Sequence, residues 1–152
     1  MRMRLSDVAS SVGKGLFAGA VGTAAMTISS TIEAKLTERE PSSAPADAAG
    51  KVLGVQPRNP TGKARFSTIV HWGYGTGWGA VRAALEAAGL RGAAATAAHF
   101  TAVWGSSMVV LPSLRVSPPP TELGAAQLAI DGFHHAVYAV ATSLAYTFID
   151  RH

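Results

Sequence analysis

Four apolar stretches, nearly free of charged residues, alternate with polar connectors along the chain. A helix needs about 20 residues to cross a bilayer core of about 30 Å, and each stretch has roughly that length. The pattern therefore predicts an all-α integral membrane bundle of four transmembrane helices, forming a single membrane domain over residues 1–152. The predicted spans cover residues 15–33, 66–85, 92–111 and 123–149.

The second predicted span reaches full length only if it includes a basic residue. Its charge-free part ends before Arg82. A long arginine side chain can extend along apolar surface and place its charge at the membrane interface. We therefore expect Arg82 to lie at the membrane surface.

The connectors differ in length and proline content. Residues 34–65 form one long polar connector between the first two spans, and a short helix over Ala46 to Leu53 is predicted within it, begun by Ser43 and Pro45. An even number of spans places both termini on one side of the membrane. Lysine and arginine number six on the side of the termini and seven on the other, so the positive-inside rule does not decide the orientation. The basic N-terminus favours termini in the cytoplasm.

Small residues recur at helical spacing within the spans. The pairs are Gly15 and Gly19, Gly73 and Gly77, Gly75 and Gly79, and Ala139 and Ser143. Helices in lipid associate through close backbone approach, which such pairs permit. We interpret the glycine run of the second span as helix packing, because it has neither the dinucleotide spacing nor the lysine of a phosphate loop.

Composition agrees with a membrane location. Only 14% of the residues are charged, against about 25% in typical soluble domains. A soluble helical bundle is the alternative, and a cleaved signal peptide is a competing interpretation of residues 1–30. The net charge of +4 suits anionic lipid better than nucleic acid, because the basic residues are scattered. The absence of cysteine excludes disulfides and thiolate metal sites.

Ionisable residues at membrane depth are costly and mark candidate sites. The candidates are His71, His99, Asp131 and His135, with Glu33 at the end of the first span. Asp131 and His135 are four residues apart and share a helix face. His134 points about 100° away from His135 and cannot face the same neighbour.

Several functions remain open for these groups. The five candidates could form a proton or ion pathway, since histidine titrates near neutral pH. A metal could bind His71, Asp131 and His135. Haem between His71 and His99 is disfavoured, because their depths differ by roughly 12 Å. The alternative is a structural role in which these groups only tie the helices together. No hydrolase motif is present, so no catalytic residue and no cofactor are predicted.

Four motifs give the chain a resemblance to a known family. They are residues 15–26 leading to Glu33; His71-Trp72-Gly73-Tyr74-Gly75; Leu111-Pro112 followed by Pro118-Pro119-Pro120; and residues 131–138, Asp-Gly-Phe-His-His-Ala-Val-Tyr. In this order they resemble the YagU-like bacterial inner-membrane proteins.

The resemblance implies a small multi-pass protein of the bacterial cytoplasmic membrane without an established activity. It also implies an acid four residues before a histidine in the last span, a pattern that Asp131 and His135 match. We therefore predict a structural or accessory membrane protein, in contact with lipid and packed against a larger partner or another copy. A proton- or ion-conducting protein is the second hypothesis, and a metal or cofactor carrier the third.

Overall fold

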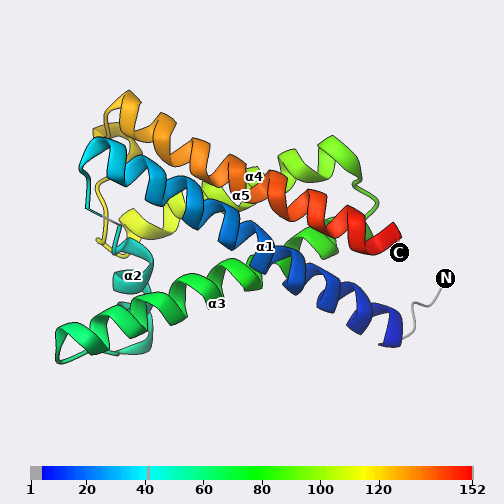
Figure 1. Cartoon of the computed structure of the whole chain (residues 1–152), viewed down its shortest axis with the longest axis horizontal. Coiled ribbons are helices and arrows are strands. Elements are labelled where there is room, and N and C mark those ends of the chain that lie inside the picture. The colour runs from blue at the N-terminus through cyan, green and yellow to red at the C-terminus, as the bar shows by residue number, and fades with distance from the viewer. Residues whose placement is uncertain (1–4, 41, 152) are drawn as a thin grey trace.

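The computed structural model describes residues 5–40 and 42–151, and within them the chain is all-helical, with five α-helices and no strand. This confirms that the fold is all-α. The start of α1 and the end of α5 lie at the same end of the bundle, on the right of Figure 1. The elements are α1 (Leu5–Thr37), α2 (Ala44–Leu53), α3 (Pro60–Ala87), α4 (Gly92–Ser113), the 3₁₀ turn η1 (Pro120–Glu122) and α5 (Ala125–Arg151).

The helices extend beyond the apolar stretches of the sequence. Helix α1 begins at Leu5 because the polar residues ahead of the first stretch are also helical, with Asp7 favourably placed in the first turn. Helix α3 begins at Pro60, inside the predicted connector. The Asn59 side chain caps it by accepting a hydrogen bond of 2.8 Å from the Gly62 amide. The short connector helix is present as α2.

Two helices of the described chain are long and apolar enough to cross a membrane, namely α1 between Ser6 and Thr37, and α4. Four spans were predicted, and two helices of the described chain meet this requirement of length and hydropathy. The other two long helices contain residues that lower their hydropathy. Helix α3 has four glycines between Gly73 and Gly79, and α5 carries Asp131, two histidines and a charged end.

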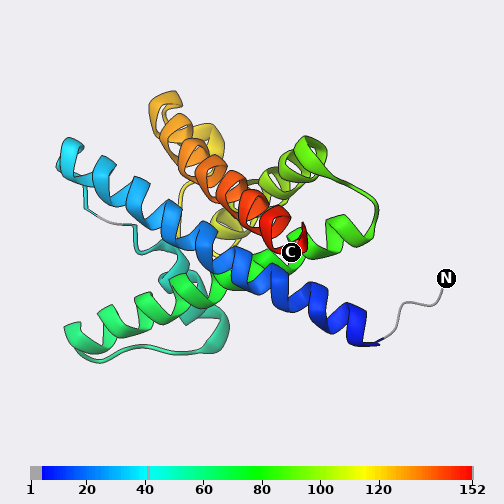
Figure 2. The ribbon, with the colours of Figure 1, turned by 45° about the vertical axis from the view of Figure 1, so that its right-hand side comes forward.

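Helix α1 is the centre of the packing. It contacts both α3 and α5 extensively, whereas α4 packs less extensively against α5 and α3. Helices α1 and α3 cross near their middles in both views (Figures 1 and 2). On the side of the connectors they diverge, and α2 packs against α3 and α4.

Glycines allow α1 and α3 to cross at backbone distance. A methyl group on Gly15 would lie 2.6 Å from the Gly79 carbonyl oxygen, and one on Gly19 would lie 2.9 Å from the Gly79 Cα. A methyl group on Gly75 would instead collide with the Thr23 side chain. Two of the predicted glycine pairs, Gly15 with Gly19 and Gly75 with Gly79, therefore pack as expected.

The packing role predicted for the remaining glycine pair, Gly73 and Gly77, was wrong. A methyl group on Gly73 or on Gly77 would meet nothing within 4 Å. These two glycines lie on the face of α3 that points away from α1, because they are offset by two residues from the pair that makes the crossing.

The distribution of polar and apolar side chains is inverted relative to that of a water-soluble bundle. The largest fully buried side chains are Arg82, His99, Thr23 and Thr142. Large apolar side chains are exposed on every long helix, for example Phe17 (62%), Ile69 (70%), Val109 (65%) and Leu144 (67%). Soluble proteins bury arginine fully almost only where it is paired, and they seldom expose large contiguous apolar surface.

Candidate functional site: polar groups between the helices

A carboxylate lies at the connector end of the bundle, near the C-terminus of α1. Glu33 accepts hydrogen bonds from Arg39 Nη2 (2.6 Å) and Thr37 Oγ1 (3.0 Å), and its side chain is 16% exposed. The hydrogen bond from Arg39 to Glu33 raises the pKa of the Arg39 guanidinium, and the charge of Asp131 adds to this effect. The Glu33 carboxylate is therefore fixed by its own segment of the chain.

His134 is the histidine of α5 that faces this carboxylate. Its Nε2 lies 3.6 Å from Glu33 Oε2, and its Nδ1 lies 2.9 Å from Ser29 Oγ. Ser29 already donates its hydroxyl proton to the Met26 carbonyl, so His134 Nδ1 must be the donor in that hydrogen bond. Within the described residues, His134 Nε2 is buried and has no hydrogen-bond partner.

Asp131 and His135 form the predicted pair on one face of α5. His135 Nδ1 donates to the Asp131 backbone oxygen at 2.9 Å and lies 3.6 Å from the Asp131 carboxylate. The carboxylate also accepts a hydrogen bond of 2.8 Å from Trp104 Nε1. Asp131 therefore joins α5 to α4 through an indole that the sequence did not single out.

His71 and His99 lie apart from this cluster and bind separate partners. His71 Nε2 donates to Thr27 Oγ1 at 2.8 Å, since Thr27 donates its own proton to the Thr23 carbonyl. His99 is completely buried, and its Nε2 donates to the Trp78 carbonyl at 3.0 Å. Within the described residues, His99 Nδ1 has no hydrogen-bond partner.

The structure does not bring His71, Asp131 and His135 together into the metal site that the sequence left open. In residues 5–40 and 42–151, no group of three or more acidic or histidine side chains is arranged to hold a metal ion. His71 binds α1, whereas Asp131 binds α4, so the similar depths estimated from the sequence did not bring the two side chains together.

Arg82 is also placed differently from the prediction. Its side chain does not extend outward along an apolar surface but is 1% exposed between the helices. Its Nε donates to Ser143 Oγ at 3.1 Å, and its Nη1 lies 2.9 Å from Glu86 Oε2. The guanidinium also stacks over the Tyr146 ring, 4.8 Å from the centroid. These contacts satisfy a buried cation that would otherwise be very costly.

The sequence interpretation missed His134 as a central residue, although a signal for it was present. His134, Tyr138, Thr142 and Tyr146 are spaced by four residues along α5, and all four are buried. This spacing defines one helix face. The Tyr138 hydroxyl donates to the Gly75 carbonyl at 2.6 Å, so the stripe contacts α3 as well as α1. Trp104, Ser29 and Arg39 had no comparable signal.

Comparison of the chain with protein-family models, with curated proteins and with solved structures yields no match.

Proposed function

We propose that the chain is a multi-pass membrane protein of structural or accessory type, with α1, α3, α4 and α5 as its four spans. The observation that supports this proposal most strongly is the inverted burial. Phe17, Ile69 and Leu144 point outward, while Arg82 and His99 are buried between the helices. Lipid removes the cost of the exposed apolar side chains, and Arg82 and His99 are each hydrogen-bonded to a neighbouring helix.

The directions of the hydrogen bonds support a structural role for the polar groups. Each of four hydroxyls near the helix crossings donates to a backbone carbonyl. These are Thr23 to Gly19, Thr27 to Thr23, Ser29 to Met26, and Tyr138 to Gly75. A hydroxyl whose proton is held by a carbonyl does not pass that proton to the next side chain. The bonds that join helices run from His71 to Thr27, from His134 to Ser29 and from Tyr138 to Gly75. Interhelical bonds of this kind contribute about 0.6 kcal/mol each on average.

The proposed location is the bacterial cytoplasmic membrane, with the termini in the cytoplasm. The resemblance to the YagU-like proteins is still a prediction, and it favours this location. An accessory role predicts a partner that co-purifies with the protein in mild detergent at a fixed stoichiometry. Purification of the protein alone, with no stoichiometric companion and no self-association, would contradict it.

Proton or ion conduction remains the second proposal, because Glu33 and His134 face each other across two helices. The structural proposal predicts that vesicles containing the protein conduct protons no faster than empty vesicles, as measured with an internal pH dye. Conduction would instead be indicated by a flux that His134→Phe abolishes and the neighbouring His135→Phe leaves intact. The second variant is the control because His135 makes no contact with Glu33 in the described structure.

A further inference from the structure

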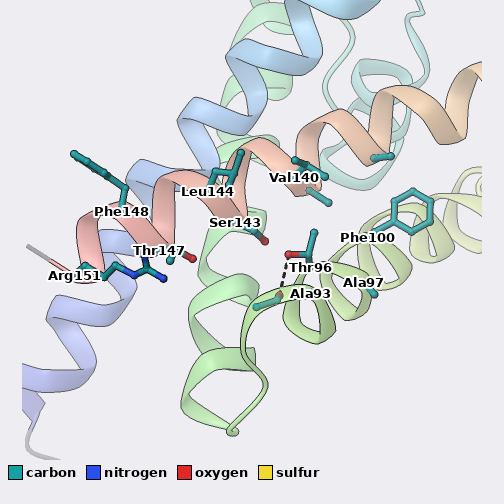
Figure 3. Close-up of a pocket in the computed structure, with 13 residues that line it drawn as sticks. Ala93, Thr96, Ala97, Phe100, Val140, Ser143, Leu144, Thr147, Phe148 and Arg151 are labelled. Carbon is teal, nitrogen blue, oxygen red and sulfur yellow. Dashed lines mark hydrogen bonds between the residues drawn. The ribbon is translucent and has the colours of Figure 1, made fainter.

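A groove of about 760 Å³ runs between α4 and α5, on the side of the bundle opposite α1 (Figure 3). It forms because α4 packs less extensively against its neighbours than α1 does. Its lining is mostly apolar, with small residues such as Ala93, Ala97 and Ala136 and larger side chains at Phe100 and Leu144. Its volume lies in the range of about 300–1,000 Å³ that is usual for small-molecule sites.

The groove is long and narrow. Its α5 wall runs from Ala136 to Arg151, a rise of about 22 Å in a helix. A single hydrocarbon chain fits along this length.

One end of the groove is positively charged. Arg151 is the only charged residue among the described residues that line it, and Figure 3 shows its side chain beside Thr147 at the end of α5. Arg91 adjoins the groove next to Gly92, but its Nε lies 3.3 Å from Glu86 Oε1 and it is therefore already paired. The nearest acid on α5, Asp150, is 2.9 Å from Lys14 Nζ and is therefore already paired. The other end of the groove, at Phe100 and Ala136, carries no charge.

We infer that this groove binds one anionic phospholipid, with an acyl chain between α4 and α5 and the phosphate beside Arg151. The inference depends on the proposed membrane location. In that location the groove extends from the surface on the side of the termini to about the middle of a bilayer core of about 30 Å. The charged end then meets the headgroups, and the apolar length meets the acyl chains.

Native mass spectrometry of the detergent-purified full chain tests the inference. The probes are phosphatidylglycerol and phosphatidylcholine with identical acyl chains. We expect saturable binding of one phosphatidylglycerol, about fivefold tighter than phosphatidylcholine, because one basic residue near an anionic headgroup contributes about that factor. Arg151→Gln should remove the preference. Arg58→Gln is the matched control, since Arg58 is exposed and lies on the connector side.

A second pair of variants tests the groove itself. Ala97 and Ala94 are both exposed on α4, but only Ala97 lines the groove. Ala97→Trp should fill the groove and abolish binding of both lipids, and Ala94→Trp should not. Equal, non-saturable lipid binding by all variants would overturn the inference. A dimer that Ala97→Trp dissociates, while lipid binding persists, would also overturn it in favour of a second copy.

If the membrane proposal itself is wrong, alkaline extraction of cell membranes will release the protein into the supernatant. A protein that remains in the membrane pellet but binds no lipid in the groove contradicts only the lipid site.

Discussion

Replacing Gly79 with alanine is expected to destabilise the protein, although the same change normally stabilises a helix. Alanine in place of glycine gains up to about 1 kcal/mol in an ordinary helix. At Gly79 the added methyl group would collide with the Gly15 carbonyl oxygen and lie 2.7 Å from the Gly19 backbone. Overpacking of this kind costs about 1–3 kcal/mol. The upper end of that range applies, because the methyl group meets the backbone of both Gly15 and Gly19. After the gain in helix propensity, we expect a net loss of about 2 kcal/mol in the free energy of unfolding.

The matched control for this prediction is Gly77→Ala on the same helix. Gly77 has open space where the methyl group would lie, so only the gain in helix propensity remains, and stability should rise by up to about 1 kcal/mol. The measurement is unfolding in mixed micelles, followed by circular dichroism as the denaturing detergent increases. Equal effects of the two substitutions would contradict the backbone-to-backbone crossing of α1 and α3.

The second large effect is expected at Arg82. Arg82→Leu removes the cation from a buried site and leaves Glu86 with only the exposed Arg91, whose Nε lies 3.3 Å away. Removal of one partner from a buried ion pair costs about 3–5 kcal/mol. The lower end of that range applies, because Glu86 is partly exposed. We expect a loss of about 3 kcal/mol in the same unfolding measurement.

Two further variants separate charge burial from a general effect of losing an arginine. Arg65→Leu changes an exposed arginine of the same helix and should alter stability by less than about 0.5 kcal/mol. The double variant Arg82→Leu with Glu86→Leu removes both charges and should be more stable than Arg82→Leu alone. An Arg82→Leu protein as stable as Arg65→Leu would show that Arg82 does not hold α3 to α5.

The sequence predicted the helices well, because long apolar stretches and prolines act locally. It also identified the glycines of the α1–α3 crossing at Gly15, Gly19, Gly75 and Gly79. It did not distinguish these from Gly73 and Gly77, since both pairs have the same spacing and only the rotation of α3 about its axis decides which face is buried.

The polar site was less predictable for the same reason. Depth along a helix can be estimated from residue numbers, but the direction of a side chain depends on helix rotation and on the partner that is present. Asp131 and His135 were paired correctly because their contact lies within one helix. The contacts of Glu33 with His134 and of Asp131 with Trp104 join separate helices, so spacing alone did not reveal them. Arg82 was misplaced because its partners, Ser143 and Tyr146, lie on another helix.

The most direct test of the membrane proposal uses the absence of cysteine in the chain, which makes single introduced cysteines easy to interpret. Val52 on α2 and Leu144 on α5 are almost equally exposed, at 68% and 67%. In permeabilised membranes, we predict that a water-soluble maleimide labels Val52→Cys but not Leu144→Cys, because lipid covers the second position. Both should react after unfolding in detergent. Equal labelling of the two cysteines in the native protein would contradict the proposal that α5 spans a membrane.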